Sequence, residues 1–302
     1  MKKKLLLTGH AGFVAGSVVW QARDDWDVYG ISRSQTPEKR EGFQSYQFDL
    51  TNTDALRECF EAIKPDAVIH AAAIADIDYC QANQDQAQAI NFSTTHELAK
   101  LCASYNAKMV FCSTDTVFDG KKGLYTESDP PNPVNFYGET KVRAEQSVLE
   151  QLESGVVARL PLVMGLPILG TGNSFLAKMM TAMSTGQAMK FPENEIRTPA
   201  DVITLGAALL ELAGDHNNGI IHLSGSTVIN RYEMGKRIAA VLGYAPELVL
   251  PTDSNAMPDR APRPIDVSLD NSKAKSILNT PMQTLEQGLQ LVLTSKDKQN
   301  NE

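Results

Sequence analysis

The chain has 302 residues, of which 28 are basic and 36 acidic, so its formal net charge is -8. This length is enough for one large domain or two of ordinary size. The negative charge works against binding to nucleic acid or to an anionic membrane surface, so neither partner is expected. No stretch approaches the ~18 consecutive apolar residues of a membrane span.

The four cysteines show no CxxC spacing and are expected to be buried free thiols, which fits a reducing cytoplasm. They are Cys59, Cys80, Cys102 and Cys112. The apolar part of residues 1–7 is too short for a signal peptide. We therefore expect a cytoplasmic protein whose first buried strand follows a short N-terminal lead.

Short apolar runs alternate with helical patterns through the first half of the chain, which is typical of a parallel sheet covered by helices on both faces. The predicted strands are Lys4–Thr8, Val28–Ser32, Ser45–Asp49, Ala67–Ala72, Lys108–Ser113 and Val156–Leu160. The predicted helices between them include Asp54–Ile63, Gln86–Tyr105 and Tyr137–Gln151. This pattern predicts the α/β class, with a Rossmann-type doubly wound parallel sheet of six strands.

The alternation ends after Leu160, where proline and glycine residues punctuate a loop-rich passage. Further elements are predicted beyond it: a helix at Phe175–Met183, a strand at Gly219–Leu223, a helix at Tyr232–Leu242 and a loop at Met257–Pro264. We expect residues 1–160 to form a nucleotide-binding domain, to which part of 196–223 returns. Residues 161–302 then form mainly a smaller C-terminal substrate-binding region.

A glycine-rich turn joins the first predicted strand to a helix. Gly9, Gly12 and Gly16 have the spacing TGxxGxxG, one residue wider than GxGxxG. Such glycines let the backbone turn tightly and approach a pyrophosphate, whose charge then lies at the helix N-terminus. A structural turn is the alternative, which the strand before and the helix after it disfavour. The residues expected to bind the dinucleotide here are Gly9, His10, Ala11, Gly12, Phe13 and Val14.

The end of the second strand indicates which dinucleotide binds. An NAD site usually has an acidic residue there for the ribose 2′-hydroxyl, and this chain has none. Ser32, Arg33 and Ser34 instead provide hydroxyls and a guanidinium suited to a 2′-phosphate, which favours NADP(H). A solvated Arg33 is the alternative. Adenine contacts are expected from Asp49 and Leu50, and close approach of the cofactor along Ala71, Ala72 and Ala73.

Tyr137 and Lys141 lie four residues apart at the start of a predicted helix, so both side chains project from one face. A nearby ammonium stabilises a phenolate and draws the tyrosine pKa down, which suits a general acid that protonates a carbonyl oxygen. Thr114, at the end of the fifth strand, is expected to hold that oxygen, with Ser113 as the alternative. A chance surface pair and a simple capped turn are the competing interpretations of these two motifs.

Seven segments together resemble the dTDP-4-dehydrorhamnose reductase family of extended short-chain dehydrogenases/reductases. They are TGHAGFVAG, VIHAAA, STDTVFDG, NFYGETK, RTPADV, HLSGSTVINRYEM and RAPRPIDVSLDNSK, in the expected order over nearly the whole chain. The resemblance implies the fold, an NADPH preference and a catalytic trio of Thr114, Tyr137 and Lys141. It also implies that Asn91 supports the lysine through water. The implied activity is reduction of a keto-sugar, a nucleotide-linked 4-keto-6-deoxy sugar.

Departures from the family pattern concentrate where a sugar nucleotide would bind. Thr116 stands where the family usually has an aromatic residue. After the strand that ends at Leu160, the family commonly has Trp and Tyr, whereas this chain has the apolar residues Leu162 and Met164. Asp115 lacks the neighbouring glutamate of the related dehydratases, so reduction is expected rather than elimination. Asp115 is also expected to contact the substrate.

Arginines are the expected partners of an acidic substrate. Arg197, Arg260 and Arg263 are candidate clamps for a diphosphate, with structural hydrogen bonding as the alternative. His10 and His70 lack partners at metal-ligand spacing, so no metal is expected. Two alternative functions stay open: a non-catalytic NADP-binding subunit resembling the methionine adenosyltransferase beta subunit, and a sugar-nucleotide epimerase. A homodimer is expected from the superfamily.

Overall fold

The computed structural model describes residues 2–22, 25–34, 41–169, 174–256 and 260–300. Part of the predicted Met257–Pro264 loop, residues 257–259, lies outside this set. The strands of the main sheet are β1 (Lys3–Thr8), β2 (Trp26–Ser32), β3 (Phe43–Gln47), β4 (Ala67–His70), β5 (Lys108–Thr114), β6 (Val156–Leu160) and β11 (Gly219–His222). Its flanking helices are α1 (Phe13–Gln21), α2 (Thr53–Ile63), α5 (Thr94–Tyr105), α6 (Phe136–Gln151) and α8 (Val202–Gly214).

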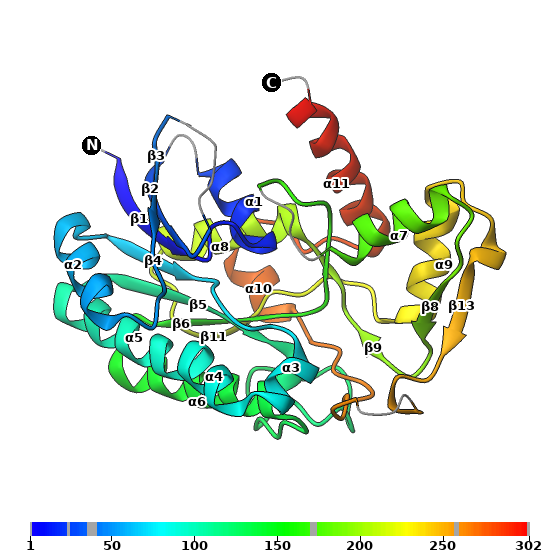
Figure 1. Ribbon diagram of the computed structural model, residues 1–302, viewed down its shortest axis with the longest axis horizontal. Coiled ribbons are helices and arrows are strands. Elements are labelled where there is room, and N and C mark those ends of the chain that lie inside the picture. Colours follow the sequence, from blue (N-terminus) through cyan, green and yellow to red (C-terminus); the bar gives the residue numbers. More distant parts are fainter. Residues whose placement is uncertain (1, 23–24, 35–40, 170–173, 257–259, 301–302) are drawn as a thin grey trace.

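The main sheet is parallel throughout, with the strand order β11-β6-β5-β4-β1-β2-β3. The strand order reverses beside β1, as in a doubly wound fold, which confirms the predicted α/β Rossmann-type class. The six strands predicted in the first half of the chain are all present, and a seventh joins them. The seventh strand, β11, lies within the predicted strand Gly219–Leu223, returns from the second half of the chain and pairs with β6 at the sheet edge (Figure 1).

Alternate side chains of β1 build two separate cores, one on each face of the sheet. Leu5 and Leu7 pack with helices α1 and α8, whereas Leu6 packs with α2, α5 and α6. All three leucines are completely buried. Strand periodicity of two therefore gives both faces an apolar surface, which the two helical layers in Figure 1 cover.

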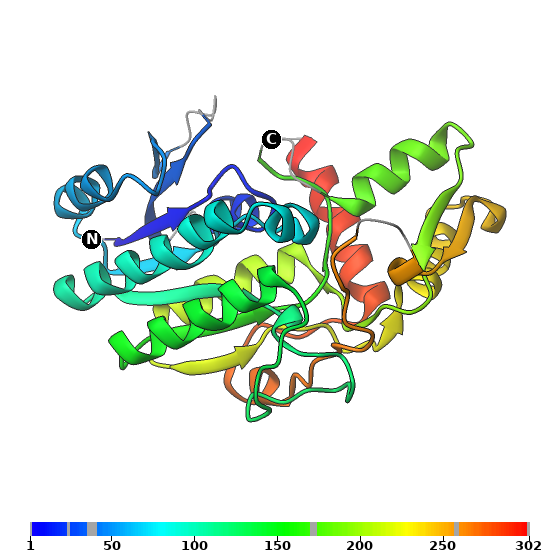
Figure 2. The same cartoon turned by 60° about the horizontal axis from the view of Figure 1, so that its bottom comes forward.

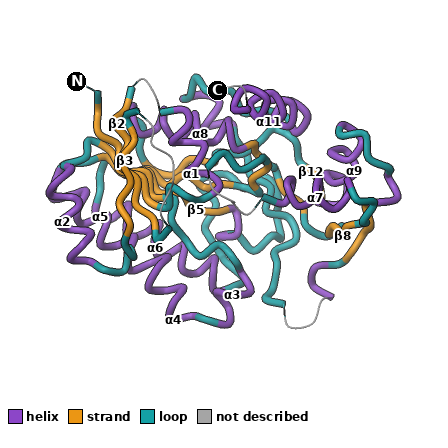
Figure 3. Tube along the Cα trace, turned by 45° about the horizontal axis from the view of Figure 1, so that its top comes forward, coloured by secondary structure: helices purple, strands orange, loops and turns teal. Residues whose placement is uncertain are grey.

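The C-terminal region has a third core of its own, in which Met164, Leu176 and Ile238 are buried. Its helices are α7 (Phe175–Ser184), α9 (Arg231–Val241), α10 (Ser272–Ile277) and α11 (Leu285–Asn300). Its short strands form two-stranded pairs; they are β7 (Val163–Met164), β8 (Met189–Pro192), β9 (Ile196–Arg197), β10 (Ala200–Asp201), β12 (Ile229–Asn230) and β13 (Val249–Thr252). Figure 3 shows α7, α9 and β8 at the end of the molecule away from the main sheet. No helix in the described part of the chain has the length and apolar composition to cross a membrane.

The long predicted helix Gln86–Tyr105 is interrupted in the structure. Helix α3 (Ile77–Ala82) precedes a short α4 (Gln84–Ala87), and a π-helical segment, η1 (Gln88–Ser93), leads into α5. A π-helix admits one extra residue per turn and is often found at functional sites. It carries the buried Asn91 here. A 3₁₀ turn, η2 (Asp115–Val117), similarly follows β5.

Two predicted strands end earlier than expected. The third runs over Phe43–Gln47, so Asp49 lies in the turn that follows it, where its carboxylate accepts hydrogen bonds from the amide and hydroxyl of Thr51. The fourth ends at His70, which leaves Ala71, Ala72 and Ala73 in an irregular segment. Both changes move candidate cofactor residues from the sheet to its carboxyl edge.

Candidate active site

The glycine loop has the geometry of a phosphate cradle. Gly9 has a φ of +72°, and a Cβ on it would lie 2.9 Å from the Cα of Ala72. A Cβ on Gly12 would lie 2.9 Å from the carbonyl oxygen of Gly9. Gly12 begins helix α1, and no side chain caps its first turn among the described residues. The loop thus brings backbone close to the helix N-terminus, where an anion is stabilised.

The other residues of this loop have different surroundings. The imidazole of His10 is completely buried, lies edge-on to Phe43 with ring centroids 5.4 Å apart, and occupies the space that a Cβ on Gly30 would need. Gly16 lets the backbone of Leu169 approach α1, since a Cβ there would lie 3.2 Å from its nitrogen. Cofactor contact by His10, Ala11, Phe13 and Val14 stays a prediction, and the His10 side chain serves packing.

The residues expected to select the cofactor meet at the ends of β2 and β3. Ser32 accepts a hydrogen bond from the amide of Ser34 at 3.0 Å and donates one to its carbonyl at 3.1 Å, forming a tight turn. Arg33 is exposed, and its backbone carbonyl accepts from Gln47 at 3.0 Å. Hydrogen bonds from Thr51, and to a smaller extent the positive charge of Arg33, lower the pKa of Asp49. The guanidinium is therefore near the predicted adenine side of the site, and Leu50 is buried in the second core.

The catalytic candidates come from two elements that pack tightly together. Tyr137 and Lys141 are buried near the start of α6, and Thr114 is buried at the end of β5. The Thr114 hydroxyl lies close enough to the Tyr137 phenol to lower its pKa. The same hydroxyl also lies 2.9 Å from that of Thr116 and donates to Asp115 at 3.2 Å. The structure thus brings the predicted hydroxyl and phenol together.

Lys141 is anchored from two sides. Its ammonium donates a 2.7 Å hydrogen bond to the carbonyl of Cys112 and lies 4.0 Å from the centroid of the Phe111 ring. Burial lowers its pKa to about 8. Burial raises the pKa of Tyr137, against the lowering effect of the nearby Thr114 hydroxyl. The lowering of the Tyr137 pKa by Lys141 stays a prediction.

Asn91 joins the catalytic helix to the exit of β4. Its side-chain oxygen accepts from the amide of Ile74 at 2.8 Å, and its nitrogen donates to the Ile74 carbonyl at 3.0 Å and to the Thr140 hydroxyl at 3.3 Å. Thr140 in turn donates to the carbonyl of Tyr137 at 2.7 Å. Asn91 therefore clamps the chain on both sides of the site; water-mediated support of the lysine stays a prediction.

Two residues of this site went unnoticed in the sequence. Thr140 is one, and Gly138 is the other, because a Cβ there would lie 2.5 Å from the carbonyl oxygen of Thr116. Only glycine lets α6 approach the turn after β5 so closely. The signal that could have found both is the run YGET itself, since these residues lie between Tyr137 and Lys141.

Ser113, the alternative to Thr114, is committed elsewhere. Its hydroxyl donates to Glu145 at 2.5 Å, and Glu145 forms a buried ion pair with Arg159 at 2.7 Å. Arg159 also lies 3.3 Å from the imidazole of His222. Ser113 thus bonds Glu145 further along α6, while Thr114, the last residue of β5, lies beside Tyr137 at the start of the same helix. The geometry favours Thr114 as the hydroxyl that faces the phenol.

Asp115 and Arg197 form part of a second buried charged cluster. The Arg197 guanidinium lies 3.7 Å from Asp115 and 3.5 Å from Glu195, and it donates to the carbonyls of Ile196 and Pro264 at 2.7 and 3.2 Å. Arg197 is thus held by protein groups, and its role as a substrate clamp stays a prediction. Burial raises the pKa of Asp115 to about 6, against the opposing effect of Arg197.

The raised pKa of Asp115 gives stability a specific pH dependence. Between the ordinary value of 3.8 and about 6, the folded chain holds a proton on this carboxyl more readily than the unfolded chain. Its contribution to the free energy of unfolding therefore falls as pH rises through this window. Asp115→Asn should remove that fall, which urea unfolding at several pH values measures. Asp54→Asn, at an exposed carboxylate, is the control; an unchanged pH dependence in Asp115→Asn would contradict the assignment.

The remaining candidate arginines are tied to helix α3. Arg263 donates to Asp78 at 2.8 Å and to the carbonyl of Ala261 at 2.7 Å, and Arg260 lies 3.7 Å from Asp78. The amide of Ala261 donates to the same aspartate at 2.9 Å. These contacts hold the Pro-rich loop beside the site, so in this structure both arginines serve as structural hydrogen-bond donors. Contact with a substrate diphosphate stays a prediction.

The loop after β5 is closed by the C-terminal region. The amide of Tyr125 donates to the carbonyl of Ser268 at 2.8 Å, and a parallel bridge joins Tyr125 to Leu269. Figure 2 shows these two segments, 115–135 and 260–275, side by side beneath the sheet. The catalytic edge is thus bordered by both halves of the chain.

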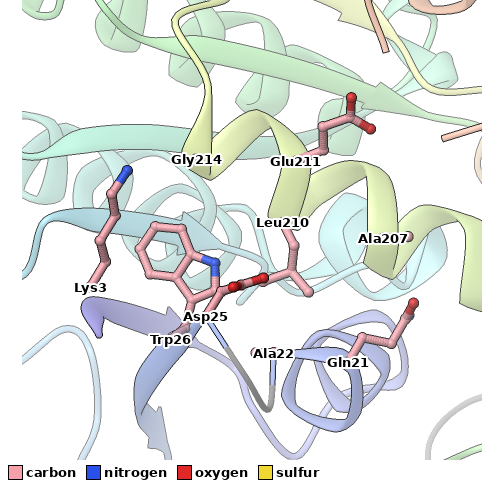
Figure 4. A pocket seen from close by; sticks show the side chains of 9 residues that line it. All are labelled: Lys3, Gln21, Ala22, Asp25, Trp26, Ala207, Leu210, Glu211 and Gly214. Carbon is pink, nitrogen blue, oxygen red and sulfur yellow. The ribbon is translucent and has the colours of Figure 1, made fainter. Parts of the chain in front are cut away.

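A separate pocket of about 570 Å³ lies at the opposite edge of the sheet (Figure 4). Lys3 and Trp26, at the amino ends of β1 and β2, line it together with Gln21 and Glu211. Gln21 donates to Ile203, and Glu211 accepts from Asn279 and Thr280. Ligands of doubly wound folds bind at the carboxyl ends of the strands, so this pocket is not the nucleotide site. Across the described ranges, no group of three or more potential ligands gathers to hold a metal ion.

The chain is similar to known proteins over nearly its whole length. A family model described as the RmlD substrate binding domain matches residues 3–297. The chain is 29% identical over 294 residues to the dTDP-4-dehydrorhamnose reductase of Mycolicibacterium smegmatis, covering 96% of this chain and 85% of that protein. It is 27% identical over 292 residues to methionine adenosyltransferase 2 subunit beta of Mus musculus, covering 93% and 85%.

A solved structure supports the same fold. The dTDP-4-dehydrorhamnose reductase of Bacillus anthracis in complex with NADP is 23% identical and has a TM-score of 0.86, covering 98% of this chain and 100% of that chain. The family model spans the main sheet, the catalytic candidates and the C-terminal region alike. The resemblance noted in the sequence motifs is thereby confirmed: the chain belongs to the RmlD substrate binding domain family.

Proposed function

We propose that this protein is an NADPH-dependent reductase of a nucleotide-linked keto-sugar, with a 4-keto-6-deoxy sugar as the substrate class. The observation that carries the proposal is the meeting of Thr114 and Tyr137, with Lys141 on the same helix, at the edge of the sheet that also bears the glycine loop. The curated relative named dTDP-4-dehydrorhamnose reductase supports the substrate class.

The residues present fit the dinucleotide. A Cβ on Gly9 or Gly12 would strike the backbone of Ala72 or of Gly9, so glycine keeps this turn tight, and the uncapped start of α1 suits a pyrophosphate. Arg33, exposed and close to Asp49, is placed for a 2′-phosphate. The Bacillus anthracis relative was solved with NADP, which supports the same choice. When bound, NADPH supplies a hydride to the substrate carbonyl carbon.

Two side chains of this protein then act on the oxygen of the substrate carbonyl. Tyr137 donates a proton to it, and the Thr114 hydroxyl donates a hydrogen bond as negative charge develops. The raised pKa of Tyr137 keeps the phenol protonated at neutral pH, which is the form that a proton donor needs. The Lys141 ammonium, fixed by the carbonyl of Cys112, stabilises the phenolate that remains.

Substrate contacts are proposed at the border of the two regions. Asp115 and Arg197 lie there together, and Arg263 holds the adjacent loop through Asp78. The apolar residues Leu162 and Met164 belong to the same border and pack in the third core. We also propose that the protein works in the cytoplasm, where its four free, buried cysteines stay reduced. A homodimer stays a prediction.

Turnover separates the proposed activity from its alternatives. Purified protein with a panel of 4-keto nucleotide sugars is expected to consume NADPH, followed by its absorbance. Tight NADPH binding without turnover would favour the alternative of a non-catalytic regulatory subunit, for which the similarity to methionine adenosyltransferase 2 subunit beta is the reason. Sugar interconversion with no net NADPH loss would favour an epimerase.

Cofactor selection gives a further prediction. Arg33→Ala should raise the KM for NADPH by about tenfold or more, since a charge-assisted contact to the 2′-phosphate is lost, while the KM for NADH changes little. Steady-state kinetics with both cofactors measure this difference. Arg57→Ala, at an exposed arginine on α2, is the control. Equal changes for the two cofactors would show that Arg33 does not bind the phosphate.

A further inference from the structure

A chain of buried hydrogen bonds runs beneath the cofactor and catalytic residues. Thr8 and His70 are the last residues of β1 and β4, and Thr95 lies in the first turn of α5; all three are completely buried. The Thr8 hydroxyl lies 2.6 Å from Nδ1 of His70, and Nε2 of His70 lies 3.0 Å from the Thr95 hydroxyl. The mechanism proposed above uses none of these side chains.

The neighbours fix the direction of every bond. Thr95 donates its only hydroxyl proton to the carbonyl of Asn91 at 2.9 Å, so it accepts from Nε2 of His70. Burial and the nearby Lys141 ammonium lower the pKa of His70 to about 3, so the ring is neutral. With the proton on Nε2, Nδ1 is an acceptor for the Thr8 hydroxyl. Thr8 itself accepts from the amide of Ala72 at 3.2 Å.

The series of hydrogen bonds from Thr8 to Thr95 reaches the glycine loop at one end and the helix of Tyr137 at the other. At one end, Ala72 is the residue whose backbone a Cβ on Gly9 would strike, so Thr8 fixes the spacing of the glycine loop. At the other end, Asn91 clamps Ile74 and, through Thr140, the backbone of Tyr137. His70 is the single side chain that joins the two ends among these contacts.

We propose that His70 is a positioning residue whose Nε2–H tautomer couples the cofactor loop to the catalytic helix. The proposal rests on the proposed function, because it assigns the Thr8 arm to NADPH binding and the Thr95 arm to catalysis. If His70 only filled space in the core, changes on the Thr8 side and on the Thr95 side would affect NADPH binding and catalysis alike. The two arms are therefore tested separately.

Four variants divide the chain of bonds. Thr8→Val and Thr95→Val each remove one hydroxyl at nearly constant volume. The amide of asparagine takes the place of Nδ1 and that of glutamine the place of Nε2, so His70→Asn keeps the Thr8 arm and His70→Gln keeps the Thr95 arm. We expect Thr8→Val and His70→Gln to weaken NADPH binding about tenfold with kcat nearly unchanged at saturating NADPH.

The other two variants should show the reverse. Thr95→Val and His70→Asn are expected to lower kcat about tenfold while the Kd for NADPH, followed by its fluorescence, changes less than twofold. Equal changes in Kd and kcat for all four variants, or a loss of thermal stability alone, would overturn the proposal. Thr181→Val is the matched control, since its hydroxyl bonds its own helix on α7, outside the site.

A second measurement is independent of turnover. In ¹⁵N NMR spectra, the His70 ring should show a protonated Nε2 and an unprotonated Nδ1 at neutral pH, with the signal assigned by its loss in His70→Gln. A protonated Nδ1 would overturn the proposal. If the wild-type protein reduces no keto-sugar, the proposed function fails, whereas the tautomer and the NADPH affinity of Thr8→Val still decide this inference.

Discussion

Tyr137→Phe is expected to lower kcat by about 10²–10⁴-fold, the usual worth of a positioned general acid. The variant loses only the phenolic oxygen that protonates the substrate carbonyl. Helix α6 keeps its anchors, because the amide of Gly138 still donates to Asn135, and Thr140 bonds the backbone of residue 137. The Kd for NADPH should therefore change little. Stopped-flow kinetics at saturating substrate and cofactor fluorescence measure the two quantities.

The control for this experiment is Tyr125→Phe, at another buried tyrosine. Its hydroxyl donates to Asp119 at 2.6 Å and accepts from the amide of Lys121, away from the catalytic helix. That variant should lose some stability and keep its kcat. Turnover by Tyr137→Phe at the wild-type rate would remove Tyr137 from the mechanism and leave a binding function as the better explanation.

The largest expected effect on stability concerns the ion pair of Arg159 and Glu145. Their side chains are 1% and 4% exposed, so Arg159→Met leaves the Glu145 carboxylate buried without its charged partner. Breaking a buried pair in this way costs about 3–5 kcal/mol of the free energy of unfolding. Urea unfolding followed by circular dichroism measures the loss.

An exposed ion pair is the matched comparison. Arg57, on α2, lies 3.4 Å from Glu97 with more than half of its side chain exposed. Arg57→Met should cost about 1 kcal/mol or less, because solvent screens such a pair. A loss in Arg159→Met no larger than that would show that the hydrogen bond from Ser113 alone is enough to hold the buried Glu145 carboxylate.

Features set by local spacing were predictable from the sequence. The glycine loop and the Tyr137–Lys141 pair each depend on residues within one turn or one helical repeat, and the structure has both elements where the pattern predicts them. The sheet was also predictable, because runs such as Leu5, Leu6 and Leu7 are apolar on both faces. The comparisons confirm the family that these motifs indicate.

Features that depend on distant partners were not predictable. Ser113 and Thr114 are equivalent in the sequence, and Glu145, 32 residues further along, decides which of them faces Tyr137. Arg263 could serve a substrate as well as the protein until Asp78, 185 residues away, is seen beside it. The π-helical turn at Asn91 was likewise not predictable, because the residues of this segment fit an ordinary α-helix equally well. Long-range pairing therefore supplied what periodicity could not.

The late return of strand β11 constrains how the protein is synthesised. Gly219 pairs with Val156, so 63 residues separate the two strands in register. Val156, Val157 and Ala158 are completely buried in the finished sheet. While the ribosome makes the intervening segment, β6 is an apolar edge strand with unpaired backbone groups, the kind of surface that promotes aggregation. Chaperones that shield nascent chains therefore have their critical interval between the emergence of Leu160 and that of His222.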